Sequence, residues 1–174
     1  MEETVVYLVG FMGCGKTSVG GRLARRLGWS FIDLDAAIEE RAGESIRRIF
    51  SVRGESCFRE IEREELRRVS RLHAVVVALG GGAFCTEENR RIVESTGLSV
   101  WLDAPMEVLL ARCAVDDTRP LFTTAEELAA LLKRRIPFYE KADIRLDVGG
   151  LTVDAAAEQI HRRLEKRFRD RRRE

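Results

Sequence analysis

Histidine and cysteine are scarce in this chain. The two histidines are His73 and His161, and the four cysteines are Cys14, Cys57, Cys85 and Cys113. The cysteines lie far apart and form no C-x-x-C pair, so a structural zinc site is not expected. This cysteine usage favours free thiols in a reducing compartment rather than a disulfide framework.

The sequence also lacks long apolar runs and a strong net charge. No run approaches the roughly 18 residues that a membrane span requires, and no charged-then-apolar leader precedes the first predicted strand. The formal net charge is +1, which creates no field toward nucleic acid or a membrane surface. We therefore expect a cytoplasmic protein with no nucleic-acid or membrane partner. Since nothing in the sequence requires an apolar interface, we also expect a monomer.

The composition is that of a globular domain, and the sequence pattern predicts strands that alternate with helices. Hydrophobic residues make up 45% of the 174 positions and charged residues 34%, as expected for one domain with its own core. Short apolar runs predict five strands, at 4–10, 29–35, 74–80, 98–103 and 142–148. Helical patterns separate them, the clearest being an apolar stripe over 153–168. This alternation predicts an α/β fold, a three-layer α/β/α arrangement around a five-stranded parallel sheet.

A glycine-rich motif follows the first predicted strand. The run "GFMGCGKT" matches G-x-x-x-x-G-K-[ST] through Gly10, Gly15, Lys16 and Thr17, and a helix is predicted after it. A loop that wraps phosphates turns its backbone N–H groups inward, which side chains would obstruct. Lys16 would reach the terminal phosphates and the Thr17 hydroxyl would bind Mg²⁺. The motif therefore predicts a site for a nucleoside triphosphate.

Two carboxylates follow at the end of the second predicted strand. Asp33 and Asp35 are two residues apart, so on a strand they would project to the same side. The carboxyl ends of such strands line the ligand crevice. One carboxylate would support the Mg²⁺ shell and the other would orient a substrate hydroxyl or take its proton. The alternative is that one of them only caps a helix beginning at Ala36.

Two further segments are unusual on structural grounds. Gly80, Gly81 and Gly82 end a buried strand, which indicates that another group approaches the backbone closely there; a flexible turn is the alternative. The segment 55–72 reads as a helix with an apolar stripe that includes Phe58, Ile61, Val69 and Leu72. Arg59 lies just off this stripe and, taken alone, reads as a surface arginine.

Together these features resemble the shikimate kinases, small members of the P-loop kinase group, over nearly the whole chain. Six markers fall in the family's order: "GFMGCGKT", the Asp33/Asp35 pair, "FRE" with Arg59, the triple glycine, "RPLF" with Arg119 and "RRIPFYEKAD" with Arg135. The resemblance implies ATP-dependent phosphorylation of the shikimate 3-hydroxyl, giving shikimate 3-phosphate and ADP, a step of chorismate and aromatic amino acid biosynthesis.

The resemblance also implies roles for individual residues. ATP and Mg²⁺ would be the cofactors, with Asp33 and Thr17 at the metal and with Lys16, Asp35 and Arg119 as catalytic residues. The nucleotide would be bound by Gly13, Cys14, Gly15, Lys16, Thr17, Ser18, Arg112 and Arg119. Shikimate would be bound by Asp35, Phe50, Phe58, Arg59, Gly80, Gly81, Gly82 and Arg135. Arg59 and Arg135 would clamp its carboxylate. The chain would form a single domain whose substrate-binding segment is about 33–62.

Arg119 would belong to a mobile lid, about 112–124, and Arg112 would lie against the adenine. No adenine contact is assigned in 147–152.

Two other readings stay open at this point. A different small P-loop kinase, acting on gluconate or a nucleoside monophosphate, would share the phosphate loop, and gluconate also bears a carboxylate. The Asp33/Asp35 pair, the glycine run and the R-x-P-x-Y segment at 135–139 favour shikimate. A non-catalytic nucleotide-binding module is the second alternative, but such a module would be expected to have lost Lys16 or Asp35.

Overall fold

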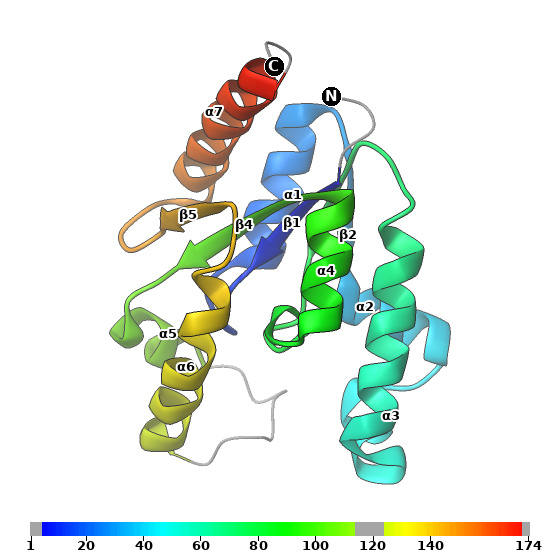
Figure 1. Cartoon of the computed structure of the whole chain (residues 1–174). Helices are drawn as coiled ribbons and strands as arrows, with labels where there is room; N and C mark the ends of the chain where they lie inside the picture. Colours follow the sequence, from blue (N-terminus) through cyan, green and yellow to red (C-terminus); the bar gives the residue numbers. More distant parts are fainter. Residues whose placement is uncertain (1–4, 114–123, 172–174) are drawn as a thin grey trace.

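The computed structural model describes residues 5–113 and 124–171, and it places a single sheet at the centre of the chain (Figure 1). The strands are β1 (Val5–Val9), β2 (Ser30–Asp33), β3 (Val75–Ala78), β4 (Gly97–Asp103) and β5 (Ile144–Asp147). The helices are α1 (Lys16–Leu27), α2 (Leu34–Ala42), α3 (Ile46–Val69), α4 (Glu87–Thr96), α5 (Met106–Cys113), α6 (Ala125–Tyr139) and α7 (Val153–Arg171), with a 3-10 turn η1 (Ala83–Cys85) before α4. Every strand pair is parallel. The predicted α/β fold with a five-stranded parallel sheet is confirmed.

The order of the strands, β2-β3-β1-β4-β5, places β1 at the centre of the sheet. Every residue of β1 and β3 is buried, whereas the edge strands β2 and β5 are partly exposed. A strand covered on both faces needs apolar residues at successive positions, which explains the continuous valine runs in the sequence. The chain places β2 and β3 on one side of β1 and then crosses to β4 on the other. Such a reversal opens a crevice beyond the carboxyl end of the central strand.

Helices cover both faces of the sheet. Figure 1 shows α1 behind the sheet and α4 in front of it, with α3 beside α4. On its side of the sheet α1 packs against α7. The buried residues of α7 are Ala156, Ala157, Ile160, Leu164 and Phe168, which confirms the predicted stripe except at Val153. That first residue of the helix is 40% exposed because it lies at the end of the sheet layer.

Two of the predicted element boundaries are wrong. The second strand ends at Asp33 and α2 begins at Leu34, because the Asp33 carboxylate accepts hydrogen bonds from the N–H groups of Asp35 and Ala36 at 3.1 and 3.3 Å. Asp33 is therefore the helix cap, and Asp35 stands in the first turn of α2. The argument that both carboxylates project from one strand is thus incorrect.

The long helix α3 also differs from its prediction. An additional helical stretch begins at Ile46 and is interrupted at Gly54, whose φ of 81° and ψ of 171° are not helical, and the second stretch starts after Gly54, where the helix was predicted. It ends at Val69, so Leu72 lies beyond the helix and is 38% exposed. Glu62, Glu65 and Leu66 are buried on the inner face instead.

Candidate active site

The glycine-rich motif forms the loop between β1 and α1. Gly10, Gly13 and Gly15 have φ values of 139°, 77° and 94°, in the region that only glycine adopts without strain. Gly15 is the residue that caps α1 and leads directly into Lys16. The loop therefore lies at the carboxyl end of the central strand and at the amino end of a 12-residue helix. The backbone N–H groups and the dipole at a helix N-terminus favour a bound anion.

The lysine of the motif is folded onto the loop. Its Nζ donates to the carbonyl oxygens of Gly10 and Phe11 at 3.0 and 2.9 Å, so the ammonium lies within the concave side of the loop. Cys14 is buried, and its N–H donates to the Phe11 carbonyl at 3.3 Å. Its thiol packs toward Gly10, where an added Cβ would lie 3.0 Å from Cys14 Sγ. The Cys14 side chain is thus part of the loop's support.

A second contact joins the loop to α5. Arg112 donates from Nη1 to the Gly13 carbonyl at 3.0 Å. Arg112 was expected at the adenine, and the structure places its guanidinium at the phosphate loop. Ser18 is exposed on the first turn of α1. Arg119 and most of the expected lid, residues 114–123, lie outside the described residues.

Thr17 and Asp33 meet beside the loop. The Thr17 hydroxyl donates to Asp33 Oδ2 at 2.6 Å, while Asp33 Oδ1 caps α2. The cap fixes the carboxylate, so Oδ2 is held next to the hydroxyl. The two oxygens belong to the residues that were expected at Mg²⁺.

Neighbouring groups approach the three glycines after β3 closely. A Cβ added to Gly80 would lie 2.5 Å from Asp35 Oδ1, so the absence of a side chain admits the carboxylate. The same addition at Gly81 would lie 3.5 Å from the backbone nitrogen of Met12. The glycine turn therefore places Asp35 beside it on one side and the phosphate loop on the other.

Two arginines from different helices converge on the last glycine of the turn. A Cβ on Gly82 would lie 2.9 Å from Arg59 Nη2 and 3.2 Å from Arg135 Nη2. Arg59 belongs to α3 and Arg135 to α6, and each guanidinium also lies over an aromatic ring, Phe58 at 5.2 Å and Phe11 at 5.7 Å to the ring centroid. The structure thus gathers both predicted arginines at one point, and the reading of Arg59 as a surface residue is wrong.

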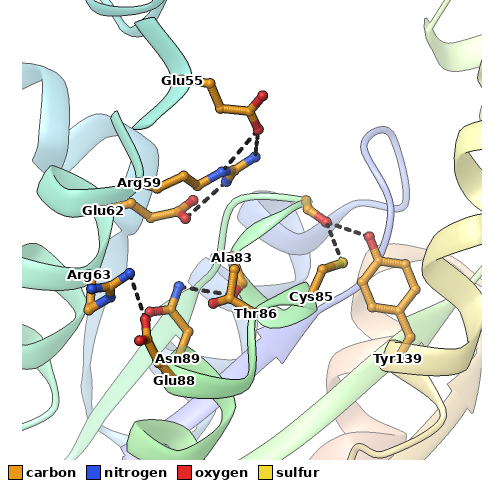
Figure 2. Close-up of polar contacts among 11 residues, drawn as sticks. Glu55, Arg59, Glu62, Arg63, Ala83, Cys85, Thr86, Glu88, Asn89 and Tyr139 are labelled. Carbon is orange, nitrogen blue, oxygen red and sulfur yellow. Dashed lines mark hydrogen bonds and ion pairs between the residues drawn. The ribbon is translucent and has the colours of Figure 1, made fainter. Parts of the chain in front are cut away.

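The Arg59 guanidinium is held by two carboxylates of its own helix (Figure 2). It bonds Glu62 at 3.0 Å and Glu55 at 3.2 Å. Glu62 is 1% exposed, and burial raises the pKa of its carboxyl above the ordinary value, an effect that Arg59 partly offsets. Sequence reasoning missed Glu62. A signal was present, because Glu62 lies four residues from both Phe58 and Leu66, on the apolar face of the helix.

Phe50 and Phe58 form one wall near these arginines. Their ring centroids are 4.6 Å apart with the planes tilted by 37°. Phe58 is buried and Phe50 is half-buried. The break of α3 at Gly54 lies between them and allows the two rings to meet although they are eight positions apart.

The described residues contain no dedicated metal cage. Within 5–113 and 124–171, no three His, Cys, Asp or Glu side chains are grouped so that they could hold a metal ion. Cys14, Cys57 and Cys85 are free thiols.

A glycine-rich phosphate loop between the central strand and the first helix of a parallel sheet defines the class of P-loop kinases. The shikimate kinase family model matches residues 12–165. The chain belongs to the shikimate kinase family.

Individual relatives agree with this assignment. The chain is 45% identical to the shikimate kinase of Moorella thermoacetica, over 89% of this chain and 91% of that one. It is 48% identical to the shikimate kinase of Geobacter sulfurreducens, over 89% and 87%. The structure of the Acinetobacter baumannii shikimate kinase in complex with shikimate superposes with a TM-score of 0.90, at 36% identity and 94% coverage of both chains.

The buried Glu62 generates a prediction about stability and pH. Native Glu62 keeps its proton to higher pH than unfolded Glu62, so its contribution to the unfolding free energy falls as pH rises from 4.5 through the raised native pKa. Glu62→Gln has no proton to lose. The unfolding free energy of Glu62→Gln, relative to the wild type, should therefore rise with pH across that window.

Urea denaturation between about pH 4 and pH 8 measures this difference. Glu55→Gln is the matched control, because it removes the exposed carboxylate from the same guanidinium. A relative stability of Glu62→Gln that declines with increasing pH would mean that the Arg59 ion pair outweighs the burial of Glu62.

Proposed function

We propose that this chain transfers the γ-phosphoryl group of ATP to the 3-hydroxyl of shikimate, through the residues of the phosphate loop and the glycine turn. ADP and shikimate 3-phosphate are the products, and the reaction is a step of chorismate and aromatic amino acid biosynthesis. One observation carries the proposal: Asp35, Arg59 and Arg135 meet at Gly80–Gly82, and this turn lies against the phosphate loop. Donor and acceptor sites are therefore adjacent.

The phosphate loop forms the ATP side of the site. Backbone N–H groups of Gly13, Cys14 and Gly15 surround the phosphates, and the N-terminus of α1, with Thr17 and Ser18, adds the favourable helix dipole. Lys16 exchanges its carbonyl partners for phosphate oxygens when the nucleotide enters. Arg112 and Arg119 add positive charge from the lid side, about residues 112–124. A lid that closes excludes water, which would otherwise compete as the acceptor.

Thr17 and Asp33 fit a bound Mg²⁺. Their side-chain oxygens lie 2.6 Å apart at the mouth of the loop, and oxygen ligands suit this cation. Thr17 would bind it directly and Asp33 through water, with the nucleotide phosphates completing the shell. The ion would neutralise charge on the phosphates.

Shikimate lies between the glycine turn and the Phe50–Phe58 wall. Its carboxylate pairs with Arg59 and Arg135, whose planar guanidinium groups match a carboxylate better than ammonium groups do. The Gly81 backbone faces the substrate, and Gly80 and Gly82 leave room for the Asp35 carboxylate and the two guanidinium groups that bind it. Its 3-hydroxyl points toward Asp35 and the phosphate loop.

Phosphoryl transfer at this site depends mainly on positioning. Asp35 accepts the proton of the 3-hydroxyl as the oxygen of that hydroxyl bonds to the γ-phosphorus. The bond from the γ-phosphorus to the bridging oxygen breaks, and its electrons leave with ADP. Lys16 and Arg119 stabilise the negative charge on the group in transit.

We also propose that the protein acts as a monomer in the cytoplasm. The large apolar side chains exposed among the described residues are Val52, Leu72 and Val153, which belong to separate segments and form no single patch. In the ranges 5–113 and 124–171, no helix is long and apolar enough to cross a membrane.

The acceptor is tested by measuring ADP release from Mg²⁺-ATP with shikimate, gluconate, a nucleoside monophosphate or no acceptor. We expect turnover with shikimate alone, because paired arginines and an aspartate select a carboxylated ring with hydroxyls. Turnover with gluconate or a nucleotide instead would overturn the acceptor site. ATP binding without turnover on any acceptor would support a regulatory module.

Asp35→Asn tests the proton acceptor. The amide is nearly isosteric but cannot take a proton, so kcat should fall by roughly 10²- to 10⁴-fold, while shikimate binding measured by calorimetry stays detectable. Glu40→Gln, an exposed carboxylate at the far end of α2, is the control. A kcat of Asp35→Asn within a few-fold of the wild type would remove the catalytic role.

Asp33→Asn tests the metal role separately from helix capping. Asparagine caps helices about as well as aspartate, so the melting temperature should change little. The loss of the charge should raise the Mg²⁺ concentration that gives half-maximal rate. An unchanged Mg²⁺ dependence would place Asp33 outside the metal shell, leaving it only as the cap of α2.

A further inference from the structure

One buried hydroxyl holds the glycine turn from the side of α6. Tyr139 donates a hydrogen bond to the Gly81 carbonyl at 2.5 Å, and its side chain is fully buried (Figure 2). The ring also lies 6.0 Å from the ring of Trp101. Burial raises the pKa of the Tyr139 hydroxyl well above its ordinary value, so the hydroxyl keeps its proton and acts as the donor.

The other carbonyl groups of the turn also accept hydrogen bonds. The carbonyls of Gly80 and Gly82 accept from the N–H groups of Ala83 and Cys85, both at 3.0 Å. The Ala83 carbonyl accepts from Asn89 Nδ2 at 2.9 Å. Each carbonyl from Gly80 to Ala83 thus has a donor, and at Gly81 the short bond comes from the Tyr139 hydroxyl, with the Cys85 thiol at 4.0 Å as a second partner.

The Tyr139 bond matters because the other donor to the Gly81 carbonyl, the Cys85 thiol, is a weak one and lies 4.0 Å away (Figure 2). A peptide unit is planar and trans, so its C=O and the following N–H point in opposite directions. Between two glycines, rotation of the whole unit meets little steric resistance. With the Gly81 carbonyl fixed on Tyr139, the Gly82 N–H points away from that hydroxyl. If the Gly81–Gly82 peptide rotated, the Gly81 carbonyl oxygen would take the place of the Gly82 N–H. A carbonyl oxygen at that place would repel the carboxylate of the acceptor.

The same helix delivers the hydroxyl and one of the arginines. Tyr139 follows Arg135 by four residues, so both side chains leave α6 on one face. Arg135 approaches Gly81 and Gly82, where added Cβ atoms would each lie 3.2 Å from its guanidinium. The bond to Gly81 therefore sets the distance between the turn and the α6 arginine.

We propose that Tyr139 is a positioning residue for the acceptor, which locks the Gly81–Gly82 peptide so that the turn and Arg135 present a fixed surface to the shikimate carboxylate. The proposal rests on the proposed function, because it assigns the acceptor to this turn. It gives Tyr139 no contact with shikimate itself. Its main effect falls on the acceptor half of the site, since its hydrogen bond is to the glycine turn rather than to the adjacent phosphate loop.

Tyr139→Phe tests the proposal. Phenylalanine keeps the ring in the core and removes only the hydroxyl, so one hydrogen bond is lost. We expect KM for shikimate to rise roughly 3- to 10-fold, as for the loss of one buried hydrogen bond. KM for ATP should stay within about twofold, because the lost hydrogen bond belongs to the glycine turn and not to the phosphate loop.

Tyr7→Phe is the matched control. Tyr7 is also fully buried, and its hydroxyl bonds Thr96 Oγ1 at the end of α4 at 2.7 Å. Loss of that hydroxyl should lower the melting temperature by a similar amount and leave both KM values as in the wild type. An equal rise of KM for shikimate and ATP in Tyr139→Phe would show a merely structural role and overturn the proposal, as would an unchanged KM for shikimate.

The wild-type protein provides a second test that does not depend on the variant folding. Without shikimate, the Gly81 and Gly82 amides should each give one sharp NMR resonance, because the peptide is locked. Two sets of resonances or exchange broadening at these glycines would contradict the lock. Absence of shikimate-dependent ADP release by the wild type would instead refute the proposed function.

Discussion

The site depends on one constraint: charged side chains must come close to the backbone of the glycine turn, where no side chain stands. Asp35, Arg59 and Arg135 come from three helices and meet at Gly80–Gly82 because no Cβ stands in their way. Any other residue at Gly80 or Gly82 would overlap a carboxylate or a guanidinium at under 3.0 Å. The parallel sheet makes this meeting possible, since the turn follows β3 and the phosphate loop follows the neighbouring β1.

Bringing these charges together has a cost that the fold offsets locally. Glu62 is buried and would be unfavourable alone, but it holds Arg59 in the orientation that faces the turn. Asp33 likewise has two roles, since one oxygen caps α2 and the other meets Thr17. Residues that stabilise the folded chain thus also preorganise the site, so acceptor binding does not have to order the arginines.

Structural features that depend on residues close together in the sequence could be predicted from the sequence. The strands follow from buried valine runs, and the phosphate loop follows from glycine spacing next to a strand. The position of Asp35 could not be derived correctly, because the side chain of Asp33 ends the strand two residues early. Glu62 and Tyr139 were missed because both become buried only when distant elements pack together. In the sequence, Glu62 stands in a highly charged helix and Tyr139 in a basic segment, so neither looks buried. The close approach to the three glycines could be predicted from the sequence alone, whereas Asp35, Arg59 and Arg135 were expected in the same site only from the family resemblance.

The central claim is that Arg59 and Arg135 form one carboxylate site at the glycine turn. Calorimetric titration of shikimate into the wild type, Arg59→Lys, Arg135→Ala and the double variant tests it most directly, with Arg91→Ala as an exposed control. Arg59→Lys keeps a charge beside Glu62. We predict that Arg135→Ala weakens binding by about 2 kcal/mol, roughly 30-fold in Kd, and that the double variant loses less than the sum of the single losses. Single variants that bind shikimate as tightly as the wild type would contradict the account.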